Sequence, residues 1–191
     1  MHSFWVSSRI GQDALGTPKE LAQTIGARLA ALARAHDLAR PGLLQAEAEI
    51  RKPMTLHALL RAVLAPYLDS DGSMKRERLM IKGCDVPIAE NAVSSLALVL
   101  HELATNSVKL GSLSLAKGGV RVDCSSKNGQ VLVAWKEQRG PRVNGPPQQQ
   151  GFGSLLASRI VAGQFRGEIS YDWKPTGLIV RLSAPIERIR G

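Results

Sequence analysis

Residues 87–114 read PIAENAVSSLALVLHELATNSVKLGSLS, and this stretch decides the fold of the chain. Pro87 is typical of a first helical turn, and apolar residues recur every three or four positions from Ile88 to Leu100. Because apolar residues cover much of the circumference, we expect a long and largely buried central helix. The polar residues of this helix gather at its end, in the segment 101–109.

Alternating strands and tight turns follow the central helix. Asn128-Gly129 is a strong signal for a two-residue hairpin turn, and Pro175-Thr176-Gly177 marks a second turn. The loop 139–153 is rich in glycine and proline. The predicted elements are strands at 76–82, 119–124, 130–137, 168–173 and 178–184, a helix from Thr55 that Pro66 ends, the helix opened by Pro87, and a helix over 154–165.

The N-terminal part has a different pattern. Residues 17–38 predict an amphipathic helix with Thr17 as N-cap, and a shorter helix is predicted over 4–15. Together they form a helical hairpin, which ends where Pro41-Gly42 breaks the pattern. We therefore expect an α+β protein with a helical hairpin at 1–42 and an α/β layer at 43–191. Because a lone hairpin leaves an apolar face uncovered, it favours a homodimer.

Composition excludes several classes of protein. The chain has 191 residues, with 25 Lys and Arg against 16 Asp and Glu, which gives a formal charge of +9. The basic residues are scattered and lack interleaved aromatic residues, so we expect no nucleic-acid partner. No apolar run approaches the roughly 20 residues that cross a bilayer, and no signal peptide is evident, so we expect a cytoplasmic protein. Cys84 and Cys124 lack the spacing of a zinc site or a disulfide scaffold.

Three polar side chains share one face at the end of the central helix. Glu102 and Asn106 are four residues apart, and Lys109 is three residues further on. A carboxylate and an amide oxygen are ligands that suit Mg²⁺, and an ammonium group suits phosphate. The alternative is a solvated polar stripe at the end of an amphipathic helix, since ladders of Glu and Lys are common there.

A second group of residues lies around the glycine-rich loop. Glu137 ends a strand, and Gly151-Phe152-Gly153 lies where the loop enters a helix. Glycines at such an entry let backbone N–H groups approach an anion, and a carboxylate can accept a hydrogen bond from an exocyclic amine such as that of adenine. A flexible helix entry and a surface glutamate are the alternatives.

The two groups together, in this order and spacing, resemble the HWE histidine kinases, a bacterial family within the GHKL ATPase group. The similar segments are LALVLHELATNSVKLGSLS, VLVAWKEQRGP and GFGSLLASRIV. The family is named for a histidine in its N box, here His101, and for a Trp-x-Glu motif, here Trp135-Lys136-Glu137. The resemblance covers about residues 17–186 and includes the dimerisation helix.

The resemblance implies a Bergerat-type sandwich, a mixed sheet covered by helices, with ATP between the N-box helix and a flexible lid. It implies that Asn106 is the Mg²⁺ ligand, that Glu102 positions water and metal, and that Lys109 contacts phosphate. Glu137 stands where the wider group has its adenine-reading carboxylate. As a signature residue, His101 is implied to belong to the catalytic set with Glu102 and Lys109. Its chemistry alone assigns it no role, and we expect a neutral imidazole hydrogen-bonded to a neighbour. Trp135 fits a core position. The implied lid glycines are Gly140, Gly151 and Gly153.

Two residues near the expected nucleotide depart from the family. The Trp-x-Glu motif is usually followed by Gly-Gly-Pro, but this chain has Arg139-Gly140-Pro141, so a side chain stands where backbone approaches the nucleotide. Leu110 replaces the tyrosine that usually follows the N-box lysine. An arginine at this place either blocks the nucleotide or holds a phosphate.

A larger departure concerns the phosphoacceptor. The His-Arg-x-x-Asn pattern of the family is absent, and His2, followed by Ser-Phe-Trp, is the only nearby histidine. We expect either a fragment or start-site truncation of a longer kinase, or a member with a degenerate dimerisation helix. The first hypothesis is an ATP- and Mg²⁺-dependent histidine kinase core that passes phosphate to a response-regulator receiver domain. The alternative is a degenerate adaptor or histidine-phosphotransferase-like protein that binds a receiver without ATP turnover.

Overall fold

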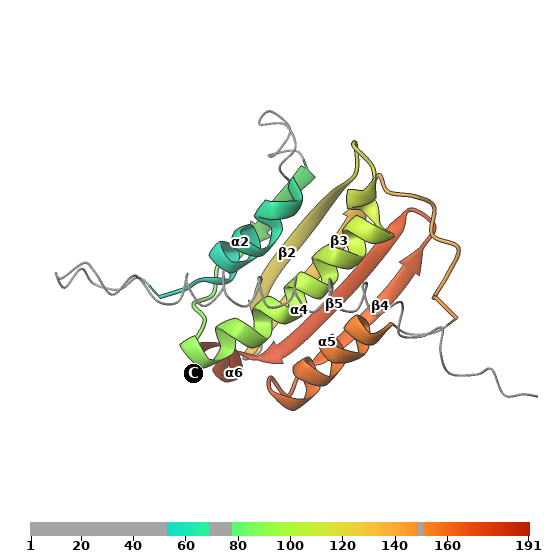
Figure 1. Cartoon of the computed structure of the whole chain (residues 1–191). Helices are drawn as coiled ribbons and strands as arrows, with labels where there is room; N and C mark the ends of the chain where they lie inside the picture. Colours follow the sequence, from blue (N-terminus) through green and yellow to red (C-terminus); the bar gives the residue numbers. More distant parts are fainter. Residues whose placement is uncertain (1–52, 69–77, 149–150) are drawn as a thin grey trace, which may run out of the picture.

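A computed structural model describes residues 53–68, 78–148 and 151–191. The predicted helices at 4–15 and 17–38, the domain boundary at residue 42 and His2 all lie outside these residues. The described part is a sheet with helices packed on one of its faces (Figure 1). The α+β class predicted from the sequence is confirmed.

The sheet has five strands in the order β1-β2-β3-β5-β4. β1 is parallel to β2 and the other pairs are antiparallel, so the sheet is mixed, as predicted. Asn128 and Gly129 have φ of 51° and 72°, which is the backbone that a two-residue hairpin turn requires. The strands are β1 (Leu79–Gly83), β2 (Gly119–Lys127), β3 (Gln130–Gln138), β4 (Glu168–Lys174) and β5 (Gly177–Pro185).

Three helices lie side by side on one face of the sheet, with α4 between α2 and α5 (Figure 1). No described helix is long and apolar enough to span a membrane. The helices are α2 (Leu56–Leu68), α4 (Glu90–Lys109), α5 (Phe152–Gly163) and α6 (Ile186–Arg190), with a short 3-10 helix η1 (Ser112–Ser114) after α4.

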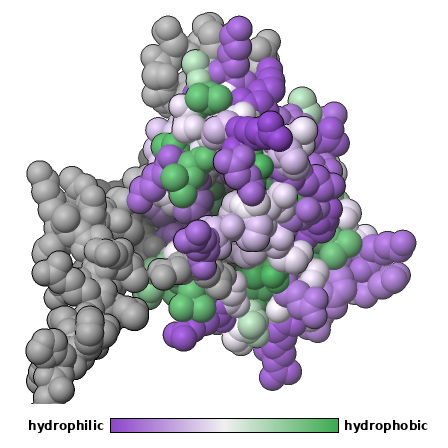
Figure 2. All heavy atoms as spheres, turned by 90° about the vertical axis from the view of Figure 1, so that its right-hand side faces the viewer, coloured by the Kyte–Doolittle hydropathy of each residue, from purple (hydrophilic) through white to green (hydrophobic). Residues whose placement is uncertain are grey.

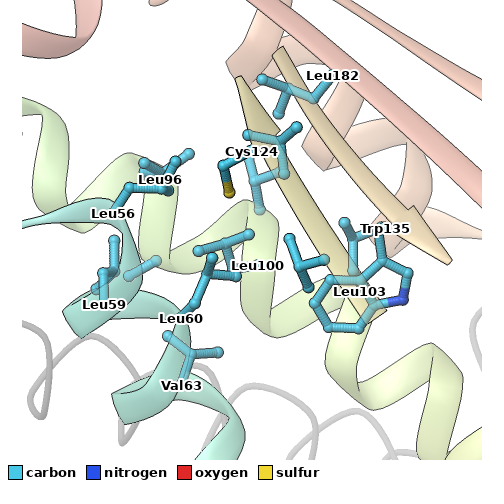
Figure 3. Packing of buried hydrophobic residues seen from close by; sticks show 14 of the residues in the cluster. Leu56, Leu59, Leu60, Val63, Leu96, Leu100, Leu103, Cys124, Trp135 and Leu182 are labelled. Atoms are coloured by element: carbon cyan, nitrogen blue, oxygen red, sulfur yellow. The ribbon is translucent and has the colours of Figure 1, made fainter. Parts of the chain in front are cut away.

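The core fills the space between the helices and the sheet. Leu96, Leu100 and Leu103 of α4 belong to this core, and Trp135 of β3, with 1% of its surface exposed, lies beside Leu103 (Figure 3). On the other face of the sheet Leu132 is 37% exposed, and no described helix covers it. Because α4 is fixed along its whole length, the polar residues at its C-terminal end have a rigid support.

The start of α4 corrects the prediction. The helix begins at Glu90, three residues after Pro87. The segment before it is extended, because Leu56 N–H donates to Val86 O at 2.8 Å and Ile88 N–H donates to Met54 O at 2.7 Å. Pro87 therefore lies in a bridge to Thr55 and does not occupy a first helical turn.

Other boundaries also shift. α2 continues past Pro66 to Leu68, since a proline in the last turn removes only one helical hydrogen bond. α5 runs from Phe152 to Gly163, two residues earlier than predicted at each end. β1 begins at Leu79, later than predicted, and α6 was not predicted. The predicted strand positions of β2, β3, β4 and β5 are confirmed, with ends that extend by one to three residues.

Candidate functional site

The last two turns of α4 carry the three polar residues singled out in the sequence. Glu102 is 5% exposed, Asn106 is half-buried and Lys109 is exposed. The exposure of these three side chains therefore increases toward the C-terminal end of α4. Within the described residues, the Asn106 side chain makes no hydrogen bond and Lys109 makes no ion pair. Both groups are therefore available to a ligand, as the prediction requires, but their roles remain predictions.

The charge of Glu102 affects a tyrosine on β4. Burial raises the pKa of Tyr171 on β4, two serines of α5 lower it, and the negative charge of Glu102 adds to the rise. The charge of Glu102 therefore acts on the Tyr171 hydroxyl of β4.

His101 lies in the interior, with 1% of its surface exposed. Its Nδ1 is 3.0 Å from the hydroxyl oxygen of Tyr67 on α2, and the tautomer decides which of them donates. The expected hydrogen bond between His101 and a neighbour is confirmed. This contact joins α4 to α2, and it gives no sign of a catalytic role for His101.

Trp135 and Glu137, the named residues of the Trp-x-Glu motif, both contact one serine of α4. Trp135 Nε1–H donates to Ser107 Oγ at 3.3 Å, and the Ser107 hydroxyl donates to Glu137 Oε1 at 2.5 Å. Ser107 is completely buried and Glu137 is 8% exposed. Trp135 is thus a core residue, as predicted, and Glu137 is part of the interior and not a surface residue.

The second oxygen of Glu137 binds the loop after α4. Oε2 accepts a hydrogen bond from Ser112 N–H at 2.9 Å. A Cβ at Gly111 would come within 2.2 Å of this oxygen, so only glycine allows the carboxylate to approach the loop. Burial raises the pKa of Glu137, and the hydrogen bonds from Ser107 and Ser112 offset part of this rise. The role of Glu137 toward adenine remains a prediction.

The same loop is held from its other side by Arg78. The guanidinium group donates to Gly118 O at 3.0 Å, to Leu113 O at 3.0 Å and to Leu115 O at 3.3 Å. Neither Arg78 nor Ser107 was predicted from the sequence. Ser107 stands next to Asn106 on the inward face of the helix, and this position is the signal that could have identified it.

Gly140 and Arg139 begin the predicted lid. A Cβ at Gly140 would lie 2.6 Å from Ser112 Cα, so this glycine permits close packing of the lid base on η1. Arg139 has φ of 56°, in the left-handed region that favours glycine. Val143 N–H donates to Pro175 O at 3.4 Å, which ties the lid base to the β4–β5 turn.

At the far end of the lid, Gly151 precedes α5, and a Cβ there would meet nothing within 4 Å. Gly153 lies inside the first turn of α5, so it is a helix residue and not part of the loop as predicted. This side of the molecule, with the lid and β4, is largely hydrophilic with separate hydrophobic patches (Figure 2).

A hollow of about 760 Å³ lies elsewhere, over β2, β3, β4 and β5. Asp123, Leu132, Ser158 and Arg181 are among its walls, and none of the predicted site residues lines it. The predicted site residues and this hollow are therefore separate.

The donor set near Asn106 fits a magnesium ion that keeps most of its water. Glu102 and Asn106 offer hard oxygen atoms on one helix face. Within the described residues no cluster of three or more His, Cys, Asp or Glu side chains could hold a metal. Mg²⁺ is often bound by one or two protein oxygens together with substrate phosphates, so such a sparse set suits it.

Comparison with known proteins agrees with the resemblance found in the sequence. A family model described as HWE histidine kinase matches residues 6–85. Blue-light-activated histidine kinase 1 of Erythrobacter litoralis is 31% identical over 171 residues, which cover 88% of this chain and 45% of that protein. A blue-light-activated histidine kinase of Brucella anthropi is 31% identical over 173 residues, which cover 88% of this chain and 33% of that protein. The chain thus spans less than half the length of these relatives.

Solved structures agree on the fold. The histidine kinase domain of an Erythrobacter litoralis blue-light activated histidine kinase superposes with a TM-score of 0.57 at 21% identity, over 86% of this chain and 76% of that one. Histidine kinase AdeS of Acinetobacter baumannii superposes with a TM-score of 0.53 at 13% identity, over 88% of this chain and 79% of that one. Residues 6–85 thus match the HWE histidine kinase model, and the α+β part of the chain has the fold seen in histidine kinase catalytic domains.

Proposed function

We propose that this chain is the ATP-binding core of a two-component histidine kinase, which transfers the γ-phosphoryl group of ATP to a histidine for relay to a response-regulator aspartate. The observation that carries the proposal is the half-buried Asn106 amide on the same face of α4 as Glu102 and Lys109, in a chain that resembles this family. ATP supplies the phosphoryl group, and Mg²⁺ neutralises charge on its phosphates.

The residues of α4 have separate roles in this proposal. Asn106 offers an amide oxygen to Mg²⁺, and the buried Glu102 carboxylate orients water or metal from one turn below. Lys109, which is exposed, meets the phosphates at the surface. Gly140 and Gly151 let the lid change its backbone at its two ends, whereas Gly153 lies within the first turn of α5. Glu137, whose role toward adenine is part of this proposal, accepts a hydrogen bond from Ser112 N–H in the loop after α4.

The remaining parts of the proposal concern partners. The hairpin at 1–42 dimerises, the catalytic part occupies 43–191, and a receiver domain docks on the dimer in the cytoplasm. The histidine that accepts phosphate is not assigned, and His2 is a weak candidate for it. Transfer requires an acceptor nitrogen in line with the γ-phosphate, which a dimer partner commonly supplies.

The test is nucleotide binding by isothermal titration with a non-hydrolysable ATP analogue and Mg²⁺. We expect the wild-type protein to bind, and Asn106→Ala to weaken binding by about tenfold or more, since a metal ligand is lost. Asn91→Ala is the matched control, because Asn91 is an exposed asparagine at the other end of the same helix. Binding that Asn106→Ala leaves unchanged would contradict the assignment.

A degenerate adaptor is the second candidate, and Arg139 favours it. Arg139 occupies a left-handed backbone position where the family has glycine, and Leu110 is 81% exposed beside Lys109. The adaptor predicts that the wild-type protein binds a receiver domain but no nucleotide, and that Asn106→Ala does not change receiver binding. Nucleotide binding that appears only in Arg139→Gly would favour this candidate over the kinase.

A further inference from the structure

Arg78 directly precedes β1 and holds the loop that follows α4. Its guanidinium group donates to the carbonyl oxygens of Leu113 and Gly118 at 3.0 Å each, and to that of Leu115 at 3.3 Å. The backbone of Arg78 packs closely on the first residue of β2, because a Cβ at Gly119 would lie 2.9 Å from Arg78 O. One side chain, whose own backbone is held against the sheet, therefore binds three carbonyl groups of a single short loop.

The loop that Arg78 holds contains the backbone group that contacts Glu137. Ser112, the first residue of η1, donates its N–H to Glu137 Oε2 at 2.9 Å, and its carbonyl oxygen accepts from Leu115 N–H at 3.3 Å. A Cβ at Gly118 would lie 1.6 Å from the same carbonyl oxygen, so the two ends of the loop are in close contact. A displacement of the loop carbonyl groups would therefore move Ser112 N–H relative to the Glu137 carboxylate.

The Glu137 carboxylate keeps the capacity to bind a ligand. Its Oε1 accepts one hydrogen bond from Ser107, and its Oε2 accepts one from Ser112 N–H. A carboxylate has about four lone-pair sites, so both oxygens can accept another hydrogen bond from an exocyclic amine. The two donors set how the carboxylate is turned, and hence where the remaining lone pairs point. Ser107 belongs to α4, which packs on the core, whereas Ser112 belongs to the loop.

We propose that Arg78 is a positioning residue for recognition of the adenine base, because it holds Ser112 where the Glu137 carboxylate is turned toward the exocyclic amine. This inference rests on the proposed nucleotide site and on the proposed role of Glu137. In the described part of the chain, the guanidinium hydrogen bonds of Arg78 all go to the loop and none to α4. Loss of Arg78 should therefore affect recognition of the base more than the proposed contacts of Asn106 and Lys109 with metal and phosphate.

The test compares the dissociation constants of ADP and GDP, each with Mg²⁺, for the full chain and its variants. Adenine presents an amine where guanine presents an oxygen, so a carboxylate that reads the base favours ADP. We expect Arg78→Ala to weaken ADP binding by about tenfold and GDP binding by much less. Arg78→Lys, which keeps the charge but lacks the planar fork of donors, should retain more of the preference for ADP than Arg78→Ala does. Arg121→Ala is the matched control and should resemble the wild-type protein, because Arg121 of β2 donates to Asp123 and not to the loop.

Hydrogen exchange of the Ser112 amide gives a readout that needs no nucleotide. We expect faster exchange in Arg78→Ala than in the wild-type protein and in Arg121→Ala, because the loop loses three hydrogen bonds. Unchanged exchange would overturn the inference.

Two binding results would also overturn the inference while leaving nucleotide binding intact. One is an Arg78→Ala protein that is folded by circular dichroism and keeps the wild-type ratio of the two dissociation constants with no loss of affinity. The other is an equal loss of affinity for ADP and GDP, which indicates a general structural role. If Arg78→Ala does not fold, the same results in Arg78→Lys overturn the inference. A wild-type protein that binds both nucleotides equally would contradict the role of Glu137 and this inference, whereas one that binds neither would overturn the proposed function itself.

Discussion

Arg139 shows how one residue can depart from its family at a structural cost. Its φ of 56° lies in a region that costs an L-residue roughly 1–2 kcal/mol, and glycine pays no such cost there. The sequence comparison identified Arg139 as a replacement for glycine, and the backbone gives the physical reason for that glycine. The replacement of glycine by Arg139 therefore changes the backbone energy as well as the side chain.

Replacing Arg139 by glycine should stabilise the protein. We expect Arg139→Gly to raise the free energy of unfolding by up to about 1 kcal/mol, since relief of backbone strain exceeds the extra freedom of the unfolded chain. Urea denaturation measures the change. Arg166→Gly is the matched control, because Arg166 has φ of 48° and is exposed far from the lid. A clear loss of stability in Arg139→Gly alone would show that the arginine side chain contributes more than its backbone costs.

Glu137 should make stability depend on pH. Burial is the largest influence on its carboxyl and raises its pKa, so the folded protein holds this proton at higher pH than the unfolded chain does. The contribution of Glu137 to stability is therefore greatest below the ordinary glutamate pKa of roughly 4.3 and falls as the pH rises through the raised pKa.

Glu137→Gln removes this titration. We expect the stability of the variant, relative to the wild-type protein, to improve from about pH 4 to about pH 7. Urea denaturation of both proteins across that interval measures the difference. A stability difference that is constant with pH would mean that Glu137 has the same pKa in the folded and unfolded states.

The elements were predicted well where a single periodic pattern decides them. The hairpin of β2 and β3 follows from Asn128-Gly129 between alternating strands, and α4 follows from its apolar stripe. The start of α4 was wrong, because the pairing of 86–88 with 54–56 is a long-range contact that no local pattern reveals. Arg78 was missed for the same reason, since its three carbonyl partners lie in 113–118, at least 35 residues further along the chain.

The loop between α4 and β2 should tolerate no side chain at Gly118. A Cβ there would lie 1.6 Å from Ser112 O, which is backbone and cannot move aside cheaply. We expect Gly118→Ala to lower the free energy of unfolding by about 2 kcal/mol or more, measured by urea denaturation. Gly163→Ala at the end of α5 is the control, because a Cβ there meets nothing within 4 Å and alanine favours a helix. Equal behaviour of the two variants would contradict the close packing of this loop.

At the scale of the whole molecule, one face of the sheet carries the helices and the proposed nucleotide site lies at one end of that layer. The resemblance found in the sequence assigns Asn106, Lys109 and the lid glycines to one site, and this assignment stays a prediction. The alternation of β3 places Glu137 on the same inward face as Trp135, but the sequence could not reveal its partners Ser107 and Ser112, which reach it only through the tertiary fold.

The position of bound nucleotide on the protein decides whether Asn106 is part of a nucleotide site. Hydrogen–deuterium exchange is measured on the full chain with and without a non-hydrolysable ATP analogue and Mg²⁺. We predict slower exchange in 102–118 and 139–153, and no change in the strands around the 760 Å³ hollow. Protection confined to the strands around that hollow, or no protection at 102–118 when the analogue is bound, would contradict the account.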